Sequence, residues 1–278
     1  PGDPNRFYAG VRGQGVLIST NGGADWNPTA AQPTLAANGA DENNTGGADD
    51  AGETAAGADR VMLAVQNTPN AGNAVFVALI DNGRTMGVLR SPDQGGTWNA
   101  VGTLPNVNPG GQGGKHFSMI ADANGTRVYV GGDVSNTAPW VANIVMGDSS
   151  TNTWVSIVNA GANSTAPHAD SRDMVFDSAG NLIETDDGGI YRLTGPTTAG
   201  RTWQSLNGDL RITEAPSLAY DPVNNAIFTG NQDNGATTQP LARLSAPTNI
   251  GFTDGDPDTI TRAAGSWIDD RFLAGQRI

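Results

Sequence analysis

The chain has 278 residues, of which 38 are glycine, two are histidine and none is cysteine. The lack of cysteine excludes a disulfide framework, a cysteine nucleophile and thiolate-bound metal clusters. With 28 acidic against 15 basic residues, the net charge of −13 argues against binding to nucleic acid, which depends on Lys and Arg, and against an anionic membrane surface. No apolar run reaches the roughly 18 residues of a membrane span. The composition is typical of a secreted or cell-surface bacterial protein.

Short apolar strands recur along the chain. One of them returns at 6–10, 74–78, 127–131, 181–185, 226–230 and 271–275. The strand before it returns at 61–65, 117–121, 173–177 and 217–221, and the strand after it at 15–19, 87–91, 143–147 and 189–193. The period of 45 to 68 residues fits a propeller blade with loop insertions and is too long for most solenoids. No stretch shows a sustained helical stripe.

We therefore predict an all-β fold, a single β-propeller of four-stranded antiparallel blades over residues 1–278. About five blades are expected, with approximate bounds 1–30, 59–102, 116–158, 168–210 and 212–267. Residues 28–58 are rich in Ala, Gly, Asn and acid and contain no aromatic residue, which predicts an acidic surface loop. The repeat starts and stops within a blade, so we expect a piece of a larger propeller, with the rest of a parent polypeptide as partner. A five-bladed ring closed by its two ends is the alternative.

A turn that ends in tryptophan closes the repeat. Residues 91–98 have the sequence Ser-Pro-Asp-Gln-Gly-Gly-Thr-Trp, and residues 19–26 keep its Ser, Gly and Trp. We expect the Asp to accept hydrogen bonds from its own turn, the Gly to supply positive φ and the Trp to pack between neighbouring sheets. The predicted structural residues are Ser91, Asp93, Gly95 and Trp98, with Ser19, Gly23 and Trp26 in the first copy. Degenerate copies end at Trp154 and Trp203.

These turns resemble the Asp-box, or bacterial neuraminidase repeat, of sialidases, xyloglucanase-type glycoside hydrolases and sortilin-like receptors. Residues 168–173 (His-Ala-Asp-Ser-Arg-Asp), 185–192 (Thr-Asp-Asp-Gly-Gly-Ile-Tyr-Arg) and 231–235 (Asn-Gln-Asp-Asn-Gly) are similar to segments of xyloglucanase-type propellers. The resemblance covers almost the whole chain. It implies a propeller in which the Asp-box is structural and lies on the blade periphery, away from the central funnel.

Acidic residues at strand ends are the candidates for chemistry. A glycoside hydrolase needs two carboxyl groups, one as acid and one as base or nucleophile. The catalytic candidates are Asp170, Asp187 and Asp233, with Asp173 and Asp186 in the same expected cluster. Nearby arginines can hold such acids ionised or bind a substrate carboxylate. The ligand-binding candidates are His168, Arg172, Asp186, Arg192 and the off-pattern Trp140.

Parts of the enzymatic machinery that the resemblance implies are missing. The chain has no Phe/Tyr-Arg-Ile-Pro motif of sialidases, and residues 10–15 carry no acid where xyloglucanase-type enzymes have a catalytic Asp. We therefore predict a secreted or cell-surface binding and scaffold module for protein or glycan partners, without its own catalytic pair. A glycoside hydrolase that acts on polysaccharide with an Asp pair is the alternative.

Two metal sites are conceivable from the sequence. Asp254, Asp256 and Asp258 alternate along residues 254–258 and offer the oxygen ligands that calcium prefers, although the segment does not fit the EF-hand pattern. A solvated acidic hairpin is the other interpretation. A calcium-stabilised structural protein of a surface layer is thus a third hypothesis. His168 with Asp170 can also ligate a metal, or His168 can be hydrogen-bonded inside a blade.

Overall fold

The structure is a computed structural model. It describes residues 3–35, 53–66, 74–123, 125–136, 138–210, 213–223, 226–232, 235–240, 249–255, 257, 259–267 and 269–270. The chain divides into two compact units, Pro1–Ile212 and Thr213–Ile278. Among the described residues, no helix has the length and apolar character needed to cross a membrane.

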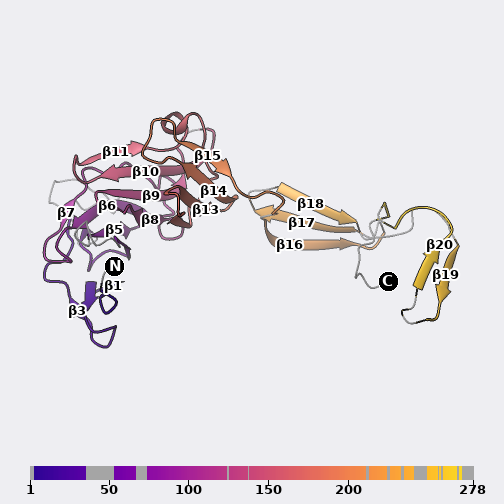
Figure 1. Ribbon diagram of the computed structural model, residues 1–278, viewed down its shortest axis with the longest axis horizontal. Helices are drawn as coiled ribbons and strands as arrows, with labels where there is room; N and C mark the ends of the chain where they lie inside the picture. The colour runs from indigo at the N-terminus through magenta and orange to yellow at the C-terminus, as the bar shows by residue number, and fades with distance from the viewer. Residues whose placement is uncertain are drawn as a thin grey trace. The chain divides into compact units, whose positions relative to one another are not determined.

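Unit 1 contains four antiparallel sheets whose strands pair in chain order (Figure 1). The first sheet comprises β1 (Phe7–Val11), β2 (Gly15–Ser19) and β3 (Asn27–Pro28). The second comprises β4 (Arg60–Val65), β5 (Val75–Asp81), β6 (Arg84–Ser91) and β7 (Asn99–Ala100). The third comprises β8 (Ser118–Ala121), β9 (Arg127–Val134), β10 (Ala142–Asp148) and β11 (Thr153–Ser156). The fourth comprises β12 (Asp173–Phe176), β13 (Leu182–Asp186), β14 (Gly189–Thr194) and β15 (Thr202–Ser205).

These bounds confirm the all-β prediction and the four-stranded antiparallel sheets, which are complete from β4 to β15. The first sheet has three strands in the part of the chain that the structure describes. The short 3-10 helix η2 (Ala160–Ala162) follows the third sheet.

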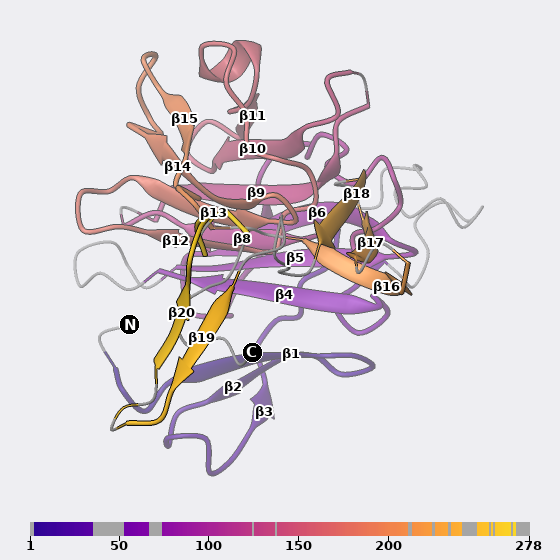
Figure 2. The ribbon, with the colours of Figure 1, turned by 90° about the vertical axis from the view of Figure 1, so that its right-hand side faces the viewer.

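The sheets of unit 1 pack on one another through their first strands (Figure 2). Strand β4 contacts β1 and β8, and β8 also contacts β12. A Cβ atom on Gly10 would lie 2.5 Å from the carbonyl oxygen of Val61, so glycine permits the close approach of β1 to β4. Three apolar clusters fill the spaces between successive sheets. They include Val16 with Leu79, Phe76 with Val130, and Tyr129 with Leu193.

The burial of each strand follows from its position among the sheets. Strand β5 is a continuous apolar run with six buried residues, because its sheet is covered by the first sheet on one face and by the third on the other. Strand β13 alternates buried and partly buried residues, as expected for a strand with one covered face.

The ends of segment 28–58 are more buried than a surface loop. Thr34 and Thr54 form an isolated antiparallel bridge, and Ala55 and Ala58 are fully buried in the cluster that contains Val16. Small side chains that lie against a sheet can be buried although their own segment has no large apolar residue. The composition of segment 28–58 therefore did not indicate this burial. Residues 36–52 lie outside the described part.

Unit 2 contains two smaller sheets. Strands β16 (Glu214–Asp221), β17 (Ala226–Gln232) and β18 (Gly235–Pro240) form one, and β19 (Ile250–Thr253) and β20 (Thr259–Arg262) form the other. Phe228 is 45% exposed, although it aligns in the repeat with Phe76, which is fully buried. The sixth repeat at 271–275 lies outside the described residues, and the single domain over 1–278 stays a prediction.

Candidate functional site

The turn at Ser91–Trp98 is a closed set of hydrogen bonds. Ser91 Oγ donates to Asp93 Oδ1 over 2.9 Å and accepts from the Gly95 N–H over 2.7 Å. Asp93 also accepts from the backbone and the hydroxyl of Thr97, and the Thr97 backbone bond is the largest cause of the lowered pKa of the Asp93 carboxyl. Gly95 has φ of 97°. The hydrogen-bonding groups of Ser91 and Asp93 are therefore used within the turn itself.

The turn at Ser19–Trp26 repeats this geometry with a neutral side chain. Ser19 Oγ donates to Asn21 Oδ1 over 3.0 Å and accepts from the Gly23 N–H over 2.9 Å. Gly23 has φ of 92°. Trp26 is 41% exposed and donates its indole N–H to Gly23 of its own turn.

The tryptophans of the three later turns, Trp98, Trp154 and Trp203, each donate a hydrogen bond to the preceding sheet. Trp98 Nε1 donates to the Ala31 carbonyl over 2.9 Å, Trp154 Nε1 to the Val101 carbonyl, and Trp203 Nε1 to the Ile157 carbonyl over 2.7 Å. Each acceptor follows the last strand of the sheet before. These indoles therefore connect each sheet to the one before it.

Several candidate acids meet where the third and fourth sheets adjoin. Asp170 precedes β12, Asp187 lies in the turn between β13 and β14, and His116 precedes β8. His116 Nδ1 lies 3.5 Å from Asp170 Oδ1, and the three residues offer ligand atoms that all lie within 4.8 Å of one another. We call His116, Asp170 and Asp187 the polar cluster.

Arg172 closes one side of the polar cluster. Its Nε donates to Asp187 Oδ1 over 2.9 Å, and its Nη2 lies 2.8 Å from the same oxygen. The Arg172 side chain is 46% exposed, whereas that of Asp187 is 19% exposed. The structure thus brings Asp170, Arg172 and Asp187 together.

A pair of buried acids, Glu184 and Asp186, lies on β13 directly before Asp187. Glu184 is fully buried, and burial, followed by the charge of Asp186, raises its pKa well above the ordinary value. Burial also raises the pKa of Asp186 to about 6, although the Gly188 N–H donates to Asp186 Oδ1 over 2.8 Å and favours the ionised form. Both carboxyl groups therefore favour the protonated form in the fold more than they would in water.

Of the remaining candidates, His168 lies beside the turn that contains Asp186 and Gly188, and the others lie apart. Tyr191 pairs with Glu184 across β13 and β14, whereas Arg192 pairs with Ile183, so alternation puts Arg192 on the other face of the sheet from Glu184. Arg192 bonds to Gln204 on β15. His168 Nδ1 lies 3.2 Å from the Ala169 carbonyl. Asp173 is exposed, as is Trp140, at 64%.

The acidic segment 254–258 is tested only in part. Asp254 is exposed, while Asp256 and Asp258 lie outside the described residues, as does Asp233. The calcium site and the role of Asp233 stay predictions.

Sequence reasoning missed two residues of this region. His116 gave no signal, because it follows a glycine-rich loop and belongs to no motif. Glu184 did carry a signal: in the aligned strands of the second and third sheets its position is held by Val77 and Val130, so a glutamate stands where these two copies have valine.

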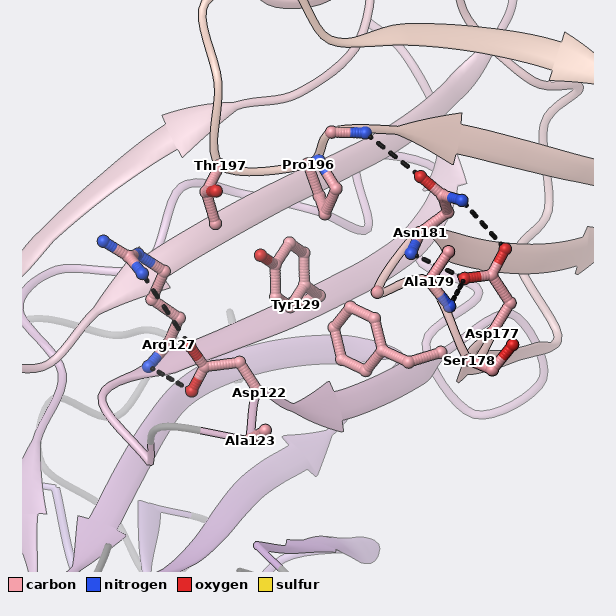
Figure 3. Close-up of a pocket in the computed structure, with 13 residues that line it drawn as sticks. Asp122, Ala123, Arg127, Tyr129, Asp177, Ser178, Ala179, Asn181, Pro196 and Thr197 are labelled. Carbon is pink, nitrogen blue, oxygen red and sulfur yellow. Dashed lines mark hydrogen bonds and ion pairs between the residues drawn. The ribbon is translucent and has the colours of Figure 1, made fainter.

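A pocket of about 540 Å³ lies where β8 and β12 end and β9 and β13 begin (Figure 3). The polar cluster lies at the opposite ends of these strands. The rings of Tyr129 and Phe176 meet edge to face at 5.4 Å and form its apolar part. Figure 3 shows Tyr129 between Arg127 on one side and Asn181 on the other. Arg127 pairs with Asp122 at 3.8 Å and with Asp148 at 3.5 Å. We call this the Tyr129 pocket.

The comparisons with known proteins give distant structural similarity. No family model and no curated protein matches the chain. The chain is similar to the GH74 xyloglucanase of Xanthomonas campestris, with 16% identity and a TM-score of 0.45, over 89% of this chain and 36% of that one. The GH74 enzyme of Niastella koreensis matches with 16% identity and a TM-score of 0.42, over 95% of this chain and 49% of that one. YCF48 of Cyanidioschyzon merolae matches with 16% identity and a TM-score of 0.41, over 94% of this chain and 68% of that one. The chain therefore spans half or less of the GH74 enzymes. At these identities and TM-scores their functions do not transfer to this chain.

Proposed function

We propose that the chain forms β-propeller blades of the Asp-box type and acts as a secreted or cell-surface binding and scaffold module. The consecutive sheets, their adjacent first strands and the tryptophans that join each sheet to the one before support the propeller. The partner is a protein or a glycan that docks on a loop face, where such folds present their binding residues.

The observation that carries the binding role is the Tyr129 pocket. Its volume of about 540 Å³ lies within the range of about 300–1,000 Å³ that is typical of ligand sites. It combines the partly exposed ring of Phe176, packed on the 1% exposed Tyr129, with polar groups at its rim. Burial raises the pKa of Tyr129 to about 12, so the phenol stays neutral at physiological pH. An apolar part with a few convergent polar groups suits one sugar ring or one side chain of a partner.

The rim groups are also held in place. Asn181 donates to Asp177 over 2.9 Å and accepts from the Gly195 N–H over 3.3 Å. The hydrogen bonds from Asn181 are the first causes of the lowered pKa of the Asp177 carboxyl. A rim whose polar groups are fixed by local hydrogen bonds loses little conformational entropy on binding.

The test uses one exposed alanine inside the pocket and one outside. Ala179→Trp fills the pocket, whereas Ala199→Trp, an exposed alanine of the neighbouring turn, adds the same ring elsewhere. Soluble β-glucans, xyloglucan oligosaccharides and a panel of extended peptides are titrated into the whole chain in a calorimeter. We expect at least one class to bind, Ala179→Trp to abolish that binding and Ala199→Trp to leave it unchanged. Failure of all the ligands, or equal binding by both variants, would refute the proposal.

A glycoside hydrolase is the second candidate, and one observation favours it. Asp186, with its pKa of about 6, lies next in sequence to Asp187, which is paired with Arg172. A carboxyl whose pKa is raised, beside a second carboxyl that is paired with an arginine, is the kind of arrangement that acid and base catalysis of glycoside cleavage uses. Release of reducing sugar by the wild type, lost in Asp186→Asn and in Asp187→Asn but kept in Asp173→Asn, would establish the enzyme and overturn the non-catalytic proposal.

A further inference from the structure

We propose that His116, Asp170 and Asp187 bind a divalent transition-metal ion of the zinc class, which would join the third sheet to the fourth. The inference goes beyond the proposed binding function and does not depend on the Tyr129 pocket. It rests on the geometry of the donors, the burial of His116, and the small number of histidines in the chain.

The three donors already converge on a common centre. Their ligand atoms lie within 4.8 Å of one another, and His116 Nδ1 is 3.5 Å from Asp170 Oδ1. Ligand atoms around one tetrahedral zinc ion, each about 2.0–2.2 Å from the metal, are about 3.4 Å apart. The His116–Asp170 pair therefore has the spacing of two ligands of one ion, and Asp187 lies close enough to join them by a side-chain adjustment.

His116 offers a nitrogen that the fold leaves without a hydrogen bond. The residue is 5% exposed, and its Nδ1 is buried and makes no hydrogen bond in the part of the chain that the structure describes. Its distance of 3.5 Å to Asp170 is longer than the roughly 2.7–3.2 Å of a protein hydrogen bond. A buried ring nitrogen without a partner costs free energy, which coordination to a metal would recover.

The backbone of His116 is anchored. Its N–H donates to the Gln112 carbonyl over 2.9 Å, and its carbonyl accepts from Asn108 over 3.0 Å. Asn108 is fully buried and accepts in turn from the Thr85 hydroxyl over 2.6 Å. The imidazole is thus attached to a rigid support, as a metal ligand requires.

The acids come from the next sheet and are partly exposed. The residues beside Asp170 are fixed: the Ser171 N–H donates to the Gly132 carbonyl, and the Arg172 N–H to the Thr185 carbonyl. The side chains of Asp170 and Asp187 are 17% and 19% exposed, which gives an ion a way in. Both contacts of Arg172 with Asp187 use Oδ1, so Oδ2 of Asp187 is available to an ion.

The donor set selects the ion. Calcium and magnesium take oxygen ligands, whereas one imidazole and two carboxylates suit zinc and the neighbouring divalent metals. The chain has no cysteine and two histidines, so His168 is the one other imidazole that can bind such an ion. This allows a direct comparison of the two histidines.

The experiment titrates Zn²⁺ into the metal-free chain of 278 residues near neutral pH, by calorimetry and by thermal unfolding. We expect one ion per chain and a rise in melting temperature. His116→Gln, Asp170→Asn and Asp187→Asn should each weaken binding about tenfold or more. Co²⁺ in place of Zn²⁺ should give visible absorption bands of a site with nitrogen and oxygen ligands.

The matched controls are His168→Gln and Asp173→Asn, which should bind Zn²⁺ like the wild type. Arg172→Gln should bind more tightly, because it removes the cation that competes for Asp187; a site that forms elsewhere would not respond. If His116→Gln fails to fold by circular dichroism, the two partly exposed aspartates decide the matter. No saturable binding, or binding lost in His168→Gln and kept in Asp170→Asn and Asp187→Asn, would overturn the proposal.

Discussion

The indole Nε1 of Trp203 donates a 2.7 Å hydrogen bond to the carbonyl oxygen of Ile157. Trp203 belongs to β15 of the fourth sheet, and Ile157 directly follows β11 of the third. The two residues are 6% and 0% exposed, so water cannot replace either group if the bond is broken.

Trp203→Phe should therefore lower the free energy of unfolding by about 1–3 kcal/mol, because the ring is largely kept while the Ile157 carbonyl loses a partner. Urea denaturation followed by circular dichroism measures the change. Trp26→Phe is the control, since its N–H bonds within its own exposed turn, and it should cost far less. Equal costs for the two variants would show that the bond between sheets contributes nothing special.

Ser91→Ala should cost about 1–2 kcal/mol of stability. Ser91 is fully buried, and its hydroxyl both donates to the Asp93 carboxylate and accepts from the Gly95 N–H. Ser19→Ala removes the same pair of bonds in the first turn, where the acceptor is the neutral Asn21, and should cost less because a bond to a charged group is stronger. Thermal unfolding of the two variants side by side provides the comparison, and a larger loss for Ser19→Ala contradicts the argument.

Glu184 should make stability fall as the pH rises. Its pKa is about 4.3 in an unfolded chain and well above that in the fold, where burial is the main cause. Between these two values the folded state holds a proton that the unfolded state has lost, so the free energy of unfolding decreases with increasing pH. The stabilising effect of the bound proton is complete below the unfolded pKa and is lost as the pH rises through the folded one.

Glu184→Gln should reduce this slope from about pH 4.5 upward and leave the part due to Asp186, whose pKa is also raised in the fold. Denaturation midpoints over a pH series measure it. Asp173→Asn, which changes an exposed acid on the neighbouring strand, should keep the wild-type slope. A Glu184→Gln profile that parallels the wild type would mean that Glu184 contributes nothing to the slope and that its pKa is not raised in the fold.

Gly131→Ala should destabilise unit 1 by about 1–3 kcal/mol through overpacking. A Cβ atom there would lie 2.7 Å from Ser118 Oγ and closer still to Ser171 Oγ, and these two hydroxyls bond to each other over 2.6 Å. Gly114→Ala, where an added Cβ meets no atom within 4 Å, is the control. Differential scanning calorimetry measures both, and a neutral Gly131→Ala would show that β12 shifts freely against β9.

Much of the sheet structure could be predicted from the sequence, because strand alternation and turn residues are local. The recurrent strands at 61–65, 117–121 and 173–177 coincide with β4, β8 and β12 to within a residue or so. Burial could not be predicted in the same way. Phe76 and Phe228 hold the same place in the repeat, yet one is fully buried and the other is 45% exposed, since burial depends on what covers a sheet.

The sequence predicted most residues of the candidate site but not the contacts between them. Asp170, Arg172 and Asp187 were all candidates, since they lie in or near acidic strand ends. Their contact with His116 depends on how one sheet faces the next, and no local pattern records that. Glu184 was visible as a break in an apolar repeat, but its protonation follows from burial, which only the packed sheets reveal.

The bonds from Trp98, Trp154 and Trp203 each reach back by one sheet. The second, third and fourth sheets therefore each carry, in or directly before the last strand, the group that attaches the sheet to its predecessor. In a chain built in this way, gene duplication or deletion can add or remove a whole sheet without changes in the others. The reason is that the tryptophan that bonds to the preceding sheet is encoded in the same segment as the sheet itself. The stability of such a chain should then grow with the number of neighbouring pairs, as in a linear array, and damage to one sheet should weaken the two adjoining it more than the rest.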